Sequence, residues 1–98
     1  MAAASRWKLC SQADLSWRTW GDESLVFNAQ SGDTHQLDLV AREGLLCLSE
    51  TALDAAELSH RLAARLEVDD DAQLGQYVDR LLSRFVDLGL LEQEMTSP

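Results

Sequence analysis

The sequence predicts an α+β domain in which a three-stranded antiparallel sheet is followed by a three-helix bundle, in the order βββααα. All three tryptophans and most turn-forming residues precede Asp38, whereas apolar residues spaced three and four apart dominate the chain after it. A length of 98 residues with 46% hydrophobic residues suits one domain with one core. We therefore expect an N-terminal arm over residues 1–14, a single domain over residues 15–92 and a frayed tail over residues 93–98.

Alternating residues and turn signals predict the three strands. Apolar and polar residues alternate from Leu15 until a Gly-Asp pair breaks the pattern, and the β-prone residues 25–27 form the next segment. The Ser-Gly-Asp cluster at residues 31–33 can reverse the chain into a third strand over residues 34–37. Residues 7–9 could add another short extended piece near the N-terminus, although no turn residue supports it.

The first two helices are predicted from their N-terminal caps. Asp38 is well placed to cap a helix that runs from Leu39 to about Glu50. Leucines lie on opposite sides of this helix, so we expect it to be the central one, covered on both faces. Asp54 and Glu57 have the spacing of a capping box, and apolar residues then repeat at helical intervals, which predicts a second helix.

The third helix is predicted to be the longest. Asp70 followed by Gln73 gives a second capping pattern, and Gly89 supplies the C-terminal stop. Its apolar stripe consists of Leu74, Tyr77, Val78, Leu81, Phe85 and Leu88. Residues 90–92 could either return as a short strand or pack on the bundle, and the sequence leaves both alternatives open.

Charge and hydropathy exclude several classes of function. Seventeen acidic and eight basic residues give a formal charge of -9, which repels nucleic acid and anionic lipid surfaces. No apolar run approaches the roughly 20 residues that span a bilayer, and no secretion signal follows the first methionine. We therefore expect a soluble cytoplasmic protein that binds neither nucleic acid nor membranes.

The sequence contains no pattern of catalytic or metal-binding residues. Glycine-rich phosphate loops are missing, and Cys10 and Cys47 lie far apart, which predicts two free thiols. His35 and His60 fall on different predicted elements without a partner at ligand spacing. We expect no metal, no cofactor and no catalytic residue, with His35 on a sheet face and Cys47 buried as a small apolar side chain.

Strands combined with three helices also suggest a winged-helix-like arrangement, in which the third helix could enter the major groove of DNA. A recognition helix carries several outward basic or amide side chains, but Arg80 and Arg84 are balanced here by Asp79 and Asp87. A DNA-binding regulator is therefore the alternative interpretation.

Several segments in a fixed order resemble a known family. They are Trp-Arg-Thr-Trp at residues 17–20, Leu-Val-Phe at 25–27 leading to Ser-Gly-Asp-Thr-His-Gln-Leu-Asp at 31–38, and Leu-Gly-Leu-Leu-Glu at 88–92. From about Trp17 to Glu92 the chain resembles the PqqD-like peptide chaperones, in the variant that accompanies an HPr-kinase-related protein in the HPr-rel-A system. The resemblance implies the recognition-element fold of ribosomally made, modified peptides (RiPPs), whose members bind a precursor's leader peptide and present it to a modifying enzyme.

Simple physics makes peptide binding by such a fold plausible. A third strand at a sheet edge exposes unpaired backbone groups, to which an extended peptide can add. Each such hydrogen bond contributes about 0.5–1.5 kcal/mol, so four or five cannot give a micromolar complex, which needs about −8 kcal/mol. An apolar groove is also needed, and one flank of the third helix could supply it. The candidate peptide-binding residues are Thr34, His35, Gln36, Leu37, Asp38, Gly75, Asp79, Leu82 and Val86.

We therefore expect a non-catalytic adaptor that holds an extended peptide for a partner enzyme. The bound segment could be a precursor leader or part of the HPr-kinase-related protein itself. Leu82 and Val86 could instead complete the core, because a small domain has few spare apolar residues. The chain could also be a structural subunit that forms a homodimer through its edge strand.

Overall fold

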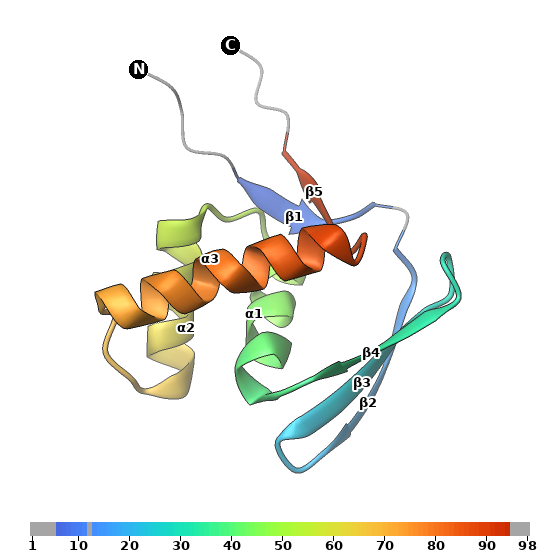
Figure 1. Cartoon of the computed structure of the whole chain (residues 1–98), viewed down its shortest axis with the longest axis horizontal. Helices are drawn as coiled ribbons and strands as arrows, with labels where there is room; N and C mark the ends of the chain where they lie inside the picture. Colours follow the sequence, from blue (N-terminus) through green and yellow to red (C-terminus); the bar gives the residue numbers. More distant parts are fainter. Residues whose placement is uncertain (1–5, 12, 95–98) are drawn as a thin grey trace.

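A computed structural model describes residues 6–11 and 13–94 of the chain. It confirms the predicted α+β fold and its order, with one short strand added at each end (Figure 1). The elements are β1 (Trp7–Leu9), β2 (Leu15–Trp20), β3 (Glu23–Asn28), β4 (Asp33–Leu37), α1 (Leu39–Glu50), α2 (Ala55–Leu66), α3 (Ala72–Asp87) and β5 (Leu91–Gln93).

The main sheet is an antiparallel meander with the strand order β2-β3-β4. Its central row places Val26 between Trp17 and His35. Side chains alternate between the two faces, and Val26 and Leu37 are buried on the face that packs on the helices. The turn before β4 includes Gly32 at φ 79°, a left-handed conformation that glycine adopts without strain. Because β4 is the last strand in the order β2-β3-β4, it is an edge strand of this sheet, as the sequence predicted.

A second sheet joins the two ends of the described chain. β1 and β5 pair antiparallel, with Trp7 opposite Gln93, and Trp7 also exchanges two backbone hydrogen bonds with Leu53, of 2.8 and 2.9 Å. Residues 91–93 thus return as a strand, while Leu90 is fully buried in the core. Parts of the predicted arm and tail therefore belong to a sheet. Residues 1–5, 12 and 95–98 of the predicted arm and tail lie outside the described residues.

Aspartates begin all three helices. Asp38 Oδ1 accepts a hydrogen bond from the Ala41 N–H at 2.8 Å, and Asp54 forms the predicted capping box with Glu57. The prediction for α3 was wrong by one residue, because Asp71 caps the helix instead of Asp70.

The carboxylate of Asp70 lies elsewhere, 3.7 Å from His60 Nδ1. In a run of three aspartates each can cap a helix, and the spacing of Asp70 and Gln73 favoured the wrong one.

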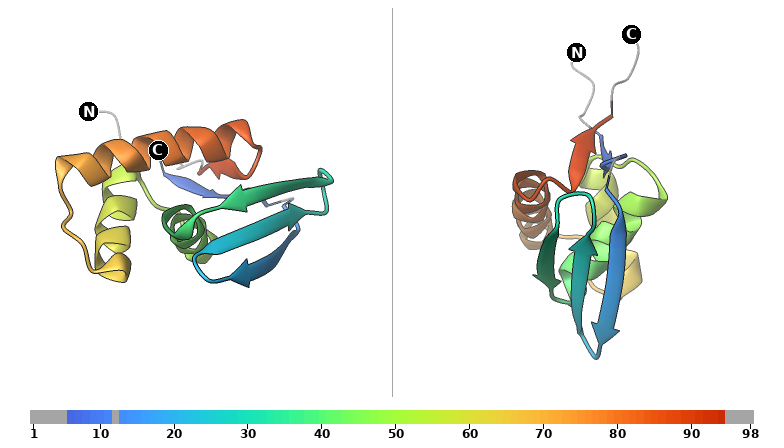
Figure 2. Two further views of the ribbon diagram at one scale, coloured as in Figure 1. Left: turned by 60° about the horizontal axis from the view of Figure 1, so that its bottom comes forward. Right: turned by 90° about the vertical axis from the view of Figure 1, so that its right-hand side faces the viewer.

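The helices enclose one core with the inner face of the sheet (Figure 2). α1 is central, as predicted, and contacts α2, β1, β3 and β4. A side chain at Gly44 would lie 2.9 Å from Leu81 Cδ2, so glycine leaves room for the Leu81 side chain of α3. α3 ends at Asp87, and Gly89 follows it with a φ of 76°, which allows the Leu90 N–H to donate to the Phe85 carbonyl at 3.0 Å. This turn carries the chain from α3 into β5.

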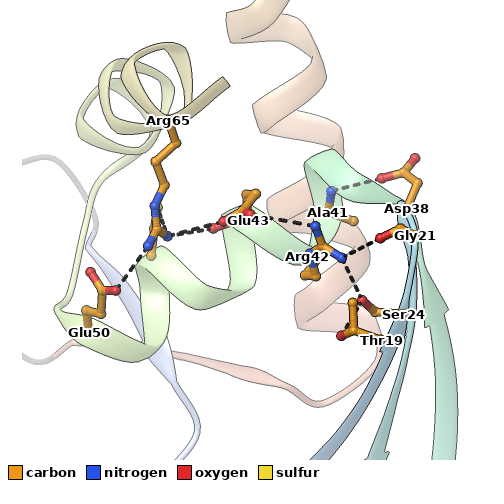
Figure 3. A network of polar contacts seen from close by, with 10 residues as sticks. Thr19, Gly21, Ser24, Asp38, Ala41, Arg42, Glu43, Glu50 and Arg65 are labelled. Atoms are coloured by element: carbon orange, nitrogen blue, oxygen red, sulfur yellow. Dashed lines mark hydrogen bonds and ion pairs between the residues drawn. The ribbon is translucent and has the colours of Figure 1, made fainter. Parts of the chain in front are cut away.

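Polar contacts fix α1 between α2 and the sheet (Figure 3). Arg65 of α2 forms ion pairs with Glu43 at 3.6 Å and Glu50 at 3.2 Å. Arg42 lies 3.8 Å from Glu43 and donates to the Gly21 carbonyl in the β2–β3 turn at 3.3 Å. These contacts link α1 to α2 and to the β2–β3 turn of the sheet.

Candidate functional site

The backbone groups of β4 point alternately toward β3 and toward the free edge of the sheet. The Ala29 N–H donates to the Asp14 carbonyl at 2.8 Å, so the backbone of Ala29 faces the β2 side. The backbone N–H and C=O groups of successive residues point to opposite sides of an antiparallel strand. The backbone of Val26, three positions before Ala29, therefore faces β4, where Val26 pairs with His35. His35 therefore bonds inward, and the N–H and C=O groups of Thr34 and Gln36 point to the free edge.

One flank of α3 lies beside this edge. Arg84 Nη2 donates to the carbonyl of Gln36 at 3.1 Å, and the Tyr77 hydroxyl donates to Asp38 Oδ2 at 3.4 Å. A surface hollow of about 320 Å³ on this flank is lined by Tyr77, Arg80, Leu81 and Arg84. We call the backbone groups of Thr34 and Gln36, together with the side chains of Tyr77, Arg80 and Arg84, the edge site.

The Tyr77 hydroxyl is a proton donor at neutral pH. Its partial burial raises its pKa, and the nearby Asp38 carboxylate raises it further by charge and by hydrogen bonding. Arg84 and Arg80 act in the opposite direction and lower the pKa. Asp38 thus caps α1 with one oxygen and holds α3 with the other.

The arginines of the edge site lack acidic partners. Four of the eight basic residues form ion pairs with carboxylates, namely Arg6, Lys8, Arg42 and Arg65. Arg80 and Arg84 form no ion pair with any residue in the described part of the chain, although the sequence contains 17 acidic residues. The edge site therefore contains two arginines without an ion-pair partner, although the Asp38 carboxylate lies beside Tyr77 and a neighbouring hollow is lined by Asp79 and Asp87 together with both arginines.

The structure does not bring all nine predicted site residues together. Residues 34–38 lie beside the flank of α3 that carries Arg84. Val86 follows Arg84 by two positions, so its side chain is turned by about 200° around the helix axis, to the opposite flank. Val86 and Leu82 line a different hollow, of about 450 Å³, with Trp7, Ala55, Asp79, Ser83 and Asp87. Gly75 lies in an adjoining hollow with Ala55 and Asp79.

The two apolar residues of this opposite flank differ in burial. Leu82 is 6% exposed and belongs to the core, as the alternative interpretation expected, whereas Val86 is 38% exposed. The role of Gly75, Asp79, Leu82 and Val86 in peptide binding stays a prediction.

Sequence reasoning missed Tyr77, Arg80 and Arg84 as site residues. It assigned Tyr77 to the apolar stripe of the third helix and described the two arginines as balanced by Asp79 and Asp87. Their spacing places them on one side of α3, but only the three-dimensional arrangement shows that this side faces β4.

His35 and Cys47, which the sequence analysis considered separately, lie in surroundings that account for them as structural residues. His35 is half-buried on the inner face of the sheet, as predicted, and its Nε2 is buried without a hydrogen-bond partner among the described residues. Cys47 is buried in the core, and its Sγ accepts a hydrogen bond from Arg65 at 3.2 Å.

Within residues 6–11 and 13–94, no three His, Cys, Asp or Glu side chains are grouped to hold a metal ion. Over the same residues, every helix is too short or too polar to cross a membrane.

Comparison with known proteins reveals a similar fold. No protein-family model matches the chain, and no curated protein is similar to it in sequence. A solved structure, TbiB1 in complex with the TbiA(beta) leader peptide, is similar with a TM-score of 0.68 at 20% identity. The similarity covers 91% of this chain and 99% of that chain. The chain therefore has the fold of TbiB1, a winged-helix-like arrangement in which three antiparallel strands precede three helices.

Proposed function

We propose that the chain is a non-catalytic adaptor that binds an extended, leader-type peptide as an additional strand at the edge of β4. The observation that carries this proposal is the outward orientation of the Thr34 and Gln36 backbone beside α3. The fold shared with TbiB1, which was solved with a leader peptide, supports it. In this function the adaptor presents the bound peptide to a modifying enzyme. That this enzyme is an HPr-kinase-related protein stays a prediction.

Backbone pairing and side-chain contacts must act together at the edge site. Thr34 and Gln36 offer two N–H and two C=O groups, and four hydrogen bonds contribute about 2–6 kcal/mol in total. This is less than the roughly 8 kcal/mol of a micromolar complex, even before the entropy of association is considered. Contacts with the α3 flank, which includes the hollow beside Tyr77, supply the remainder.

Amide hydrogen exchange tests this proposal directly. The ligands are synthetic peptides from short open reading frames adjacent to this gene and, where one is adjacent, from an HPr-kinase-related gene, with duplex DNA as the comparison ligand. Strand addition predicts that a bound peptide slows exchange of the Thr34 and Gln36 amides, whereas DNA has no such effect. The amide of His35, which faces β3, serves as the internal reference.

A variant on the opposite flank of α3 separates the two surfaces. Val86→Ser removes an apolar contact from that flank, so it should leave peptide affinity and the protection of Thr34 and Gln36 unchanged. Loss of affinity in this variant, with no protection of Thr34 and Gln36 in the parent, would place the peptide on the opposite flank and refute the edge site. Protection that grows with protein concentration in the absence of peptide would show that β4 pairs with a second copy instead.

A further inference from the structure

Arg84 occupies a backbone group that an added strand needs. Its guanidinium bonds the Gln36 carbonyl at 3.1 Å, and this carbonyl points to the free edge. In an added strand, the same carbonyl accepts a hydrogen bond from the peptide. The Arg84 side chain is exposed and has no ion pair to hold it there, so it can move when a peptide arrives.

Arg80 and Arg84 have no carboxylate within ion-pair distance in the described chain, although Asp79 and Asp87 line a hollow with them. The two arginines lie four positions apart on α3, a spacing at which like charges repel each other. Neither has a carboxylate partner in the described chain, and Arg84 has only a neutral carbonyl. A carboxylate brought by a ligand would relieve this repulsion and could accept two parallel hydrogen bonds from one guanidinium.

The geometry of an added strand directs alternate peptide side chains toward these arginines. Peptide residues opposite His35 and Leu37 would point to the same face of the sheet as those side chains. Leu37 is buried on the helix-covered face, so such residues would lie on the side of α3. Two peptide side chains, two residues apart, would therefore point toward α3, where Arg80 and Arg84 lie. We call these two peptide positions groove-facing.

We infer that Arg80 and Arg84 select extended peptides with Asp or Glu at a groove-facing position. On binding, Arg84 exchanges the Gln36 carbonyl for the peptide carboxylate, and the carbonyl then pairs with the peptide backbone. This inference rests on the proposed function and adds to it the chemical class of the ligand.

A matched pair of synthetic peptides tests the inference. Acetyl-Val-Thr-Glu-Thr-Val-Thr-amide places Glu between two valines on one face, and its Gln analogue differs only in charge. We expect the Glu peptide to bind roughly 3- to 10-fold more tightly, as measured by NMR titration on the Thr34 and Gln36 amides. The preference should largely disappear in 1 M salt, where the Debye length is about 3 Å.

Arginine variants identify the groups responsible. Arg84→Gln and Arg80→Gln should each reduce the preference for Glu, and the double variant should remove it. Arg61→Gln is the matched control, because Arg61 is an exposed arginine of α2 with no ion pair in the described chain. It should leave the preference unchanged.

The outcomes distinguish this inference from the proposed function. If both peptides shift the Thr34 and Gln36 amides with equal affinity, strand addition holds and charge selection is refuted. A Glu preference that survives in the double variant also refutes the role of the arginines. If neither these peptides nor the gene-derived peptides affect the two amides, the proposed function fails together with the inference.

Discussion

Replacing Gln36 by proline tests both the orientation of β4 and its role. Because the Gln36 N–H points to the free edge, proline there removes no hydrogen bond between β3 and β4. The preceding residue, His35, already has the extended conformation that a residue before proline prefers. We therefore expect the free energy of unfolding, measured with urea, to fall by less than about 1 kcal/mol.

Peptide binding should respond far more strongly to this substitution. Proline deprives the added strand of one donor and leaves a peptide carbonyl unpaired, which costs about 1–3 kcal/mol. The dissociation constant, measured by calorimetry with the tightest gene-derived peptide, should rise about 5- to 150-fold. Gln36→Ala keeps the N–H and removes the side chain, so it should bind within about twofold of the parent.

Two results would refute this reasoning. A proline variant that is severely destabilised would show that the Gln36 N–H belongs to the β3–β4 ladder. A stable proline variant that binds peptide as tightly as Gln36→Ala would exclude strand addition at β4.

Three further predictions concern the framework of the site, each measured by urea unfolding. Because folding raises the pKa of Tyr77, the native state holds the phenolic proton more tightly than the unfolded state does. The contribution of this group to the free energy of unfolding should be complete below about pH 10 and decrease at higher pH. Tyr77→Phe should abolish this decrease. Asp71→Ala should cost about 0.5–2 kcal/mol through loss of the helix cap, and Asp70→Ala, at the predicted but incorrect cap, less than about 0.5 kcal/mol; equal costs would contradict the assignment. Gly89→Ala should destabilise by about 1–2 kcal/mol because of its positive φ, whereas Gly75→Ala, with open space around it in α3, should stabilise by up to about 1 kcal/mol.

Local patterns determined most of the fold. Alternation and the turn at Gly32 predicted the meander, and aspartate caps with helical periodicity predicted α1 and α2. Whether residues 7–9 and 90–92 form strands was left open, and their pairing was not predicted, because it depends on contacts between distant segments with no turn between them to signal it.

The site was only partly predictable for a related reason. Periodicity shows which residues share a side of α3, but not which neighbouring element that side faces. Sequence reasoning therefore identified the strand correctly as an edge and combined it with the Val86 flank of α3. The contacts of Arg84 with Gln36 and of Tyr77 with Asp38 show that the other flank is beside the strand.

The pairing of β1 with β5 has a consequence for the order of folding. These strands join the two ends of the described chain, so their contact closes the longest loop in the domain, and loop closure of this kind carries the largest entropic cost. We expect the meander and the helices to form first and the terminal sheet last, and the same sheet to open first in the native state. Trp7 would leave with it, so the hollow beside Val86 would lose one of its lining residues when the two ends separate, whereas the β3–β4 pairing that forms the edge involves neither end.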